Sequence, residues 1–257
     1  MRRILSTILV LAASMAALPA HAQERMTVKF NDPSRPGLLK VQWHNGSIAV
    51  KTHSGGDITI AAKRGLNTRP EPPEAGGLHR IDSPNRGIVV ESDTNNVITI
   101  SSGHTDFANG NLEIEVPVKT DLKLESHNGS LVSVDGVDGD IEATNHNGAI
   151  NVVNASGSVV ADSHNGRVVV SFREIAAGKP MSFTSWNGPV DVTLPAASKA
   201  DLKLRTDNGA IYTDFDVQMK TGQAGSADKT ITGSINGGGA DFDLRTHNGN
   251  IYLRKAK

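Results

Sequence analysis

The stretch DLKLESHNGSLVSV, residues 121–134, decides the fold of this chain. Apolar and polar side chains alternate before the tripeptide His127-Asn128-Gly129, and an apolar residue follows it at Leu131. A period of two is typical of a β-strand that buries one face. Asn and Gly tolerate positive φ, so Asn-Gly between two such segments predicts a tight reversal or corner. The stretch therefore predicts a strand, a corner and a second strand.

The same pattern recurs along the chain. We predict structural turns at Asn45-Gly46, Asn128-Gly129, Asn147-Gly148, Asn165-Gly166, Asn187-Gly188, Asn208-Gly209 and Asn248-Gly249. The intervals between successive Asn residues are 83, 19, 18, 22, 21 and 40, which indicates a repeat of about 20 residues. The third residue after each Asn is apolar and is expected to face inward: Ile48, Leu131, Ile150, Val168, Val190, Ile211 and Ile251. Asn109-Gly110 is a weaker eighth copy.

Two architectures fit this repeat. In a string of hairpins, Asn-Gly forms two-residue loops. In a β-solenoid, each repeat is one coil and equivalent residues stack about 4.8 Å apart. Pro189 favours the solenoid, because the residue after a hairpin Gly donates a ladder hydrogen bond that proline lacks. We therefore predict an all-β fold, a single-stranded parallel β-helix with coils of about 20 residues, in which the Asn side chains form an amide ladder.

Small polar residues two positions before the Asn fit a crowded inward bend. They are Ser126, Asn145, Ser163, Ser185, Thr206 and Thr246. Trp43 is the exception, and we expect it to be buried and to cap the first coil.

The segments VPVKTDLKLESHNGSL and TLPAASKADLKLRTDNGAIYTDF resemble the DUF4097 family of bacterial β-strand repeat proteins, also called putative adhesins. The resemblance covers roughly residues 38–254. It implies a parallel β-helix that is exported to the cell envelope or surface. It implies no catalytic residues.

The N-terminus reads as an export signal, with Arg2 and Arg3 before an apolar run and Ala20-His21-Ala22 as a cleavage site. We predict a cleaved signal peptide at 1–22 and one domain at 23–257, without a membrane span after cleavage.

Removing Arg2 and Arg3 leaves 24 Lys plus Arg against 27 Asp plus Glu, a net charge of −3 without long single-sign runs, which argues against nucleic-acid binding. With no cysteine, disulfides and a lipidated N-terminal cysteine are excluded. The predicted location is the periplasm, or the cell surface after secretion.

A Pro- and Gly-rich stretch at about 63–87 interrupts the repeat and predicts a loop outside the stack. Arg64, Arg69 and Arg80 are candidate ligand-binding residues there, for anionic partners. The alternative is a surface loop without a ligand. A second interruption spans 220–229.

The residue before each repeated Asn carries the most suggestive chemistry. It is His44, His127, His146, His164, Trp186, Asp207 or His247. If coils stack, His127, His146 and His164 form a column, which is a candidate metal site or pH sensor. The alternative is a turn preference copied by duplication. His44, Trp186 and His247 are candidate ligand-binding residues, with Trp186 able to stack on a sugar.

We expect a non-catalytic, adhesin-like binding or scaffolding protein of the cell envelope, without a cofactor. Its partner is an envelope or surface protein, or a glycan. A metal-binding or pH-sensing periplasmic protein is one alternative. Another is a polysaccharide hydrolase or lyase, for which the pairs Asp214 with Asp216 and Asp241 with Asp243 are the candidate acids.

Overall fold

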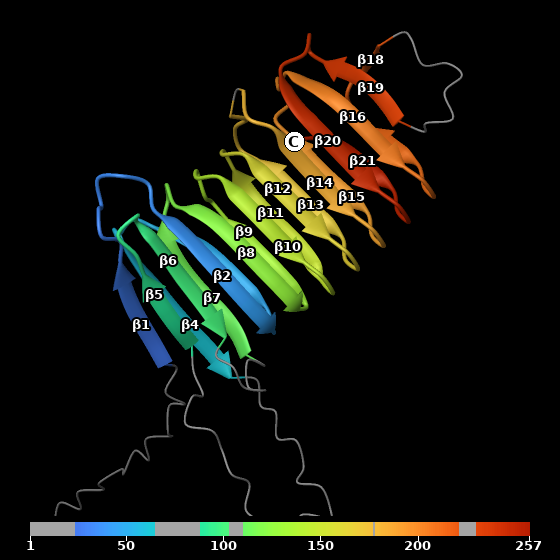
Figure 1. Ribbon diagram of the computed structural model, residues 1–257. Coiled ribbons are helices and arrows are strands. Elements are labelled where there is room, and N and C mark those ends of the chain that lie inside the picture. The colour runs from blue at the N-terminus through green and yellow to red at the C-terminus, as the bar shows by residue number, and fades with distance from the viewer. Residues whose placement is uncertain (1–23, 65–87, 103–109, 177, 221–229) are drawn as a thin grey trace, which may run out of the picture.

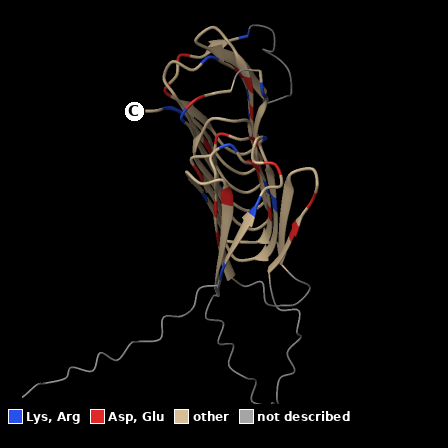
Figure 2. Cartoon of the chain, turned by 90° about the vertical axis from the view of Figure 1, so that its left-hand side faces the viewer, with Lys and Arg blue, Asp and Glu red and all other residues tan. Residues whose placement is uncertain are grey.

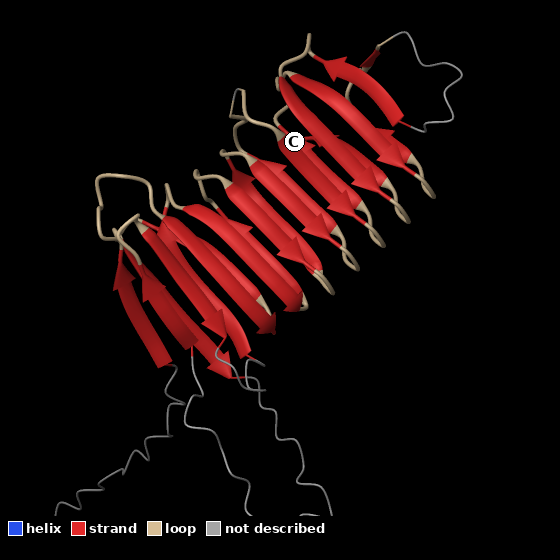
Figure 3. Ribbon diagram, in the orientation of Figure 1, coloured by secondary structure: helices blue, strands red, loops and turns tan. Residues whose placement is uncertain are grey.

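The structure is a computed structural model that describes residues 24–64, 88–102, 110–176, 178–220 and 230–257. All regular elements in these ranges are β-strands, so the all-β prediction is confirmed (Figure 3). Within the same ranges there is no helix with the length and apolar character to cross a membrane. The predicted signal peptide, Arg69, Arg80 and almost all of the two predicted loops lie outside the described residues.

The described strands form two sheets. One sheet has the order β1 (Glu24–Lys29), β4 (Asp57–Arg64), β7 (Gly110–Pro117), β3 (Ile48–His53), β9 (Leu131–Asp135), β11 (Ala149–Ala155), β13 (Val168–Phe172), β15 (Val190–Leu194), β21 (Ile251–Lys255), β17 (Ile211–Thr213). The other has the order β18 (Gln218–Met219), β19 (Thr230–Ile235), β16 (Ala200–Thr206), β20 (Ala240–Thr246), β14 (Met181–Ser185), β12 (Val159–Ser163), β10 (Ile141–Asn145), β8 (Asp121–Asn128), β2 (Leu38–Asn45), β6 (Val97–Ser102), β5 (Ile88–Ser92).

Each Asn-Gly corner joins a strand of one sheet to a strand of the other. We call such a pair of strands with its corner a unit; β8 and β9 form one. The alternating apolar side chains of both strands point between the sheets, where Leu122, Leu124, Val132 and Val134 are almost fully buried. Removal of these branched aliphatic side chains from water is the main stabilising contribution to the fold. The hairpin alternative is wrong, because the two strands beside a corner do not pair with each other.

The stretch quoted first departs from the repeat by one residue. Val132, rather than Leu131, aligns with Ile150 of the next unit and is buried, while Leu131 lies on the outer face. The predicted inward position of Leu131 is therefore wrong. The corner after Asn128 contains one residue more than the corner after Asn147, and this extra residue shifts the inward face of β9.

Neighbouring units in the middle of the stack pair in parallel and in register. Leu122 of β8 aligns with Ile141 of β10, which aligns with Val159 of β12. The carbonyl oxygen of Pro189 accepts a hydrogen bond from Val168, so proline fits at a corner where only its acceptor is used.

The units do not stack in sequence order. The unit β2–β3 lies between the strands β6 and β7 and the unit β8–β9. The unit β20–β21 lies between β14–β15 and β16–β17. Figure 1 shows this as a blue strand among green ones and a red pair between lighter strands. The expectation that neighbours are always about 20 residues apart is therefore wrong outside 121–194.

Antiparallel strands lie at both ends of the stack. At one end β4 pairs with β7 and β1 with β4, and β5 pairs with β6. At the other end β19 pairs with both β16 and β18. The sheets are thus mixed, which corrects the prediction of one single-stranded parallel β-helix. The added strands satisfy backbone donors and acceptors that a purely parallel stack leaves open at its ends.

The predicted loop at 63–87 begins later than expected. The backbone of Lys63 and Arg64 continues β4 and pairs with Asn111 and Gly110 of β7. Arg64 therefore belongs to a strand at one end of the stack. Figure 2 shows Lys, Arg, Asp and Glu spread along the described chain rather than gathered in one region.

Candidate functional site

The Asn-Gly corners lie directly over one another because backbone hydrogen bonds between neighbouring units continue from the strands into the corners. The backbone N–H of Asn147 donates to His127, and that of Asn165 donates to His146. A Cβ atom on Gly148 would lie 2.0 Å from the carbonyl oxygen of Gly129, so glycine permits the close approach of successive corners.

Positive φ is not the general reason for glycine at these corners. Among the repeated corners, only Gly46 has a φ in the left-handed region, at 107°. The described non-glycine residues with positive φ are Asn96, Asn154 and Asn236, which lie elsewhere. The prediction that the Asn-Gly pairs are used for positive φ is therefore wrong at the other corners, where steric clearance is the reason.

A column of buried polar side chains lies behind the corners. Oγ of Ser163 donates to the carbonyl oxygen of Gly148, and Asn145, Ser185, Thr246 and Thr206 make equivalent contacts to the Gly129, Gly166, Gly188 and Gly249 carbonyl oxygens. These side chains satisfy carbonyl groups that the interior would otherwise leave without a partner.

Trp43 occupies the equivalent position in its unit. Its side chain is 5% exposed and Nε1 donates to Gly110. The predicted burial is confirmed. Its predicted place at the end of the stack is wrong, because the strands β6 and β7 lie beyond it.

On the outer side of the corners, the Asn side chains form the predicted amide ladder. Five Nδ2 groups each donate to the Oδ1 of a neighbouring unit at 2.8–2.9 Å. The ladder follows the spatial order Asn128, Asn147, Asn165, Asn187, Asn248, Asn208.

Beside this ladder, six rings stack in one column. The order is His44, His127, His146, His164, Trp186, His247, with ring centroids 5.2, 5.0, 4.9, 6.0 and 4.3 Å apart. The interplanar angles are 22° or less. The structure thus brings together His44, Trp186 and His247 with the three histidines proposed as metal ligands. We call this column and the amide ladder together the ring-amide corner.

The column ends at Asp207, which replaces the ring in the last unit. Nδ1 of His247 lies 2.8 Å from Oδ2 of Asp207 and donates to it. The hydrogen bond from His247, followed by that from Arg205, lowers the pKa of the Asp207 carboxyl below its ordinary value. An ionised carboxylate therefore closes this end of the column.

The ring geometry bears on the metal and sugar hypotheses. Parallel rings about 5 Å apart direct their nitrogen lone pairs side by side rather than toward one point, whereas a metal ion needs converging ligands. Among the described residues no group of three or more His, Asp or Glu side chains is placed to hold a metal ion. Trp186 is 50% exposed, and His164 and His247 stack on either side of it, with ring centroids 6.0 and 4.3 Å away, so a sugar ring cannot insert between them.

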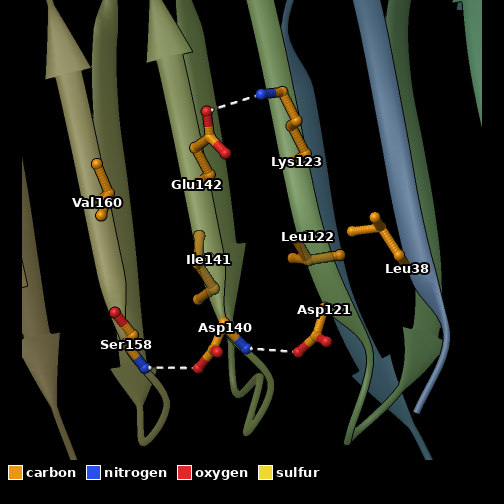
Figure 4. A pocket seen from close by; sticks show the side chains of 9 residues that line it. All are labelled: Leu38, Asp121, Leu122, Lys123, Asp140, Ile141, Glu142, Ser158 and Val160. Carbon is orange, nitrogen blue, oxygen red and sulfur yellow. Dashed lines mark hydrogen bonds and ion pairs between the residues drawn. The ribbon is translucent and has the colours of Figure 1, made fainter. Parts of the chain in front are cut away.

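A separate shallow depression of about 310 Å³ lies on the outer face of the eleven-stranded sheet (Figure 4). Its carboxylates are engaged in the fold: Asp121 accepts from the backbone N–H of Asp140, and Asp140 accepts from that of Ser158. Lys179 also pairs with Asp140. Asp121 and Asp140 thereby hold the chain segments that lead into β10 and β12.

Sequence reasoning missed one aromatic pair. Tyr212, which is half exposed, stacks on Tyr252 at 5.3 Å, and the Arg254 guanidinium lies 4.9 Å from the Tyr252 ring centroid. Both tyrosines directly follow an inward Ile in their repeats, so alignment of the units could have found them. Of the three predicted arginines, Arg69 and Arg80 lie outside the described residues and the side chain of Arg64 is not described.

The family model called Toastrack DUF4097 matches residues 38–254. The chain belongs to this family. A "putative cell adhesion protein" from Clostridium sporogenes ATCC 15579 has a similar fold, with a TM-score of 0.53, 11% identity, and coverage of 91% of this chain and 100% of that one. A "putative adhesin" from Bacteroides fragilis NCTC 9343 gives a TM-score of 0.29 and 12% identity over 93% of this chain and 99% of that one. No curated protein matches the chain.

Proposed function

We propose that this protein is a non-catalytic, exported binding or scaffolding protein of the cell envelope, with the ring-amide corner as its binding surface. Its repeats act as a β-solenoid scaffold with antiparallel ends. The observation that carries the proposal is that rings from six units and amides from six units line one exposed corner. The Clostridium protein of similar fold, described as a "putative cell adhesion protein", supports an adhesin-like role in the periplasm or at the cell surface.

The engagement of the candidate acids supports a non-catalytic reading. Asp214 accepts a hydrogen bond from the backbone N–H of Lys255, and Asp243 pairs with Arg245. A glycosidase needs two carboxylates that flank a cleft and are available to the substrate. Asp214 instead contacts a backbone N–H group, and Asp243 contacts a neighbouring guanidinium group.

Binding to envelope extracts of the source cells tests the proposed surface. The probe is the purified protein immobilised on beads, compared with a variant carrying His127→Phe, His146→Phe and His164→Phe, which keeps the rings but removes their nitrogens. Asn151→Ala, on the outer face of β11 in the other sheet, is the matched control. We expect retention of envelope material by the wild type and by N151A, and its loss with the triple variant. Equal retention by all three proteins would refute the proposed surface.

The stacked imidazoles favour pH sensing as a second candidate function. His127, His146 and His164 are parallel, so protonation places like charges about 5 Å apart in a residue type that titrates between pH 5 and 8. The charged groups within two residues of a column ring are Glu125, Asp162 and Arg245, and Arg205 lies two residues before Asp207 at the end of the column.

Thermal melting at pH 7.5 and pH 5 tests this candidate. We expect the Tm of the wild type to fall more between these pH values than the Tm of the triple His→Phe variant, because like charges about 5 Å apart oppose the stacking of the rings. An equal change in Tm for the two proteins would contradict pH sensing.

A further inference from the structure

The ring-amide corner has a translational repeat that a linear polymer can match. The four stacked imidazoles are 4.9–5.2 Å apart, close to the spacing of hydrogen-bonded strands. One pyranose in an extended β-1,4-linked chain advances by about the same distance. Such a chain laid along the stack would place successive sugars beside successive units.

The exposed edges of the Asn amides and of the imidazole rings can hydrogen bond to hydroxyl groups. Asn147 uses one amide hydrogen to reach Asn128 and one lone pair to accept from Asn165, so each amide keeps a donor and an acceptor. A neutral imidazole adds one donor and one acceptor in the plane of its ring. A hydroxyl group can donate and accept, so a polyhydroxylated chain can hydrogen bond to both the amide ladder and the ring column.

The covered ring faces restrict how a ligand can bind. His146 lies between His127 and His164, and Trp186 lies between His164 and His247. A sugar or a base therefore cannot stack on these faces. The ligand must hydrogen bond to ring edges, which favours a chain lying lengthwise on the corner.

The surroundings of the column favour an uncharged chain. Glu125 and Asp162 lie two residues before His127 and His164. Arg205 and Arg245 hold the equivalent positions before Asp207 and His247. Asp207 closes one end. Arg205 pairs with Asp207, and Arg245 pairs with Asp243. On the flank beyond the amide ladder, Ser130, Ala149 and Pro189 follow the corner glycines with small or compact side chains, and the exposed Arg167 follows Gly166. Acidic and basic groups are therefore mixed along the corner, without an excess of one sign that would favour a charged polymer.

We propose that the ring-amide corner binds a linear, uncharged, extended β-1,4-linked polysaccharide parallel to the stack, with one pyranose beside each unit. This inference rests on the proposed function, because it names the ligand class of the same surface. The six rings define a site for about six sugars, which makes the length of the best oligosaccharide a property that the structure specifies.

Calorimetric titration with chito- and cello-oligosaccharides of two to eight residues tests the inference. We expect the Kd of at least one series to fall with each added sugar up to about six and then to level off. Malto-oligosaccharides of equal length are the control, because their α-1,4 linkages curve the chain away from the straight corner. We expect them to bind at least tenfold more weakly.

The double variant His146→Phe/His164→Phe keeps the stack but removes ring-edge nitrogens from two central units. We expect it to bind the hexasaccharide at least tenfold more weakly, with an unchanged circular dichroism spectrum and Tm, while Asn151→Ala binds like the wild type. Absence of binding by both series at millimolar concentration, equal binding of malto-oligosaccharides, or no gain beyond two sugars would overturn the inference. Preference for polygalacturonate over the neutral chains would also overturn it.

Different results would overturn the glycan inference and the proposed binding surface. If none of the oligosaccharides binds but envelope retention still depends on the column histidines, the glycan inference falls and the proposed binding surface stands. If the triple His→Phe variant retains envelope material as well as the wild type, the proposed surface and the glycan inference both fall.

Discussion

Oγ of Ser163 donates a hydrogen bond to the carbonyl oxygen of Gly148 and accepts one from the backbone N–H of Gly166, each at 2.9 Å. Both contacts lie inside the stack, where Ser163 is 1% exposed. Ser163→Ala leaves a buried carbonyl and a partly buried N–H without this partner. We expect the free energy of unfolding to fall by about 1–3 kcal/mol, measured by urea denaturation.

Ser126 is the matched control for this prediction. It occupies the same position in its unit and is buried, but its Oγ has no hydrogen-bond partner among the described residues. Ser126→Ala removes a buried hydroxyl that lacks a partner, so the change in unfolding free energy should stay within about 0.5 kcal/mol. Equal losses for S163A and S126A would show that the hydroxyl-to-glycine contacts are not what stabilises the corner.

Gly148→Val should destabilise the protein severely. A Cβ atom at this position would lie 2.0 Å from the Gly129 carbonyl oxygen and 2.7 Å from that of Ser130, both backbone atoms of the preceding unit, β8–β9. The two units must separate, and we expect a loss of about 3 kcal/mol or more, at the upper end for overpacking. The midpoint of urea denaturation measures it.

Gly56→Ala provides the steric control. A Cβ atom there meets nothing within 4 Å, and the φ of Gly56 is outside the left-handed region. We expect no loss, and a gain of up to about 1 kcal/mol from lower entropy of the unfolded chain. A similar destabilisation by both substitutions would contradict the role of close corner stacking.

Asn165→Ala should weaken the amide ladder in its middle. Asn165 donates to Asn147 and accepts from Asn187, both at 2.8 Å. Loss of two exposed hydrogen bonds is expected to cost about 1–2 kcal/mol by urea denaturation. Asn208→Ala, which removes the single ladder bond to Asn248 at the end, should cost about half as much. Equal losses of unfolding free energy for N165A and N208A would indicate that stabilisation by the ladder is not proportional to the number of hydrogen bonds removed.

Acid should destabilise the fold through carboxyls such as Asp207. The hydrogen bond from His247, then Arg205, holds its pKa below the value of 3.8 for a free side chain. The folded state then binds fewer protons than the unfolded state. Its stabilisation is therefore present above about pH 4 and is lost as pH falls through the folded-state pKa. Asp138, with Ser156 as its main partner, and Asp201, with Lys220, act in the same direction.

Thermal melting between pH 5 and 2 measures this effect. Asp207→Asn removes one titrating group, so its Tm should fall less steeply below pH 4 than the Tm of the wild type. Asn151→Ala, which removes no titrating group, is the control and should keep the wild-type slope. Identical slopes for D207N and the wild type would contradict the contribution of the His247 contact.

Local features of the fold were predictable from single repeats. The inward positions Leu122 and Leu124 and the polar inward Ser163 followed from the period of two and from the spacing to the Asn. The position of Leu131 was not predictable from the average repeat, because the extra residue in its corner shifts the face of β9. The role of the corner glycines was also missed, since the clash that they avoid involves the neighbouring unit.

Part of the candidate site was likewise predictable from the sequence, and part was visible only in the structure. The recurrence of His before Asn predicted the His127, His146, His164 column. Only the structure placed His247 next to Trp186 and Asp207 next to His247, across 61 and 40 residues of sequence. It also showed that His164 and His247 stack on either side of Trp186, which favours hydrogen bonding at the ring edges over insertion of a sugar between the rings.

The sequence by itself determined the strand-corner-strand unit, because alternation of apolar residues and the properties of Asn-Gly act within a few residues of each other. The tertiary structure decided the order of the units and the mixed ends of the sheets. Units with nearly the same sequence offer nearly the same hydrogen-bonding edges to one another. Which edge pairs with which therefore depends on the packing of the whole stack, in which β2–β3 and β20–β21 are inserted between units distant in sequence.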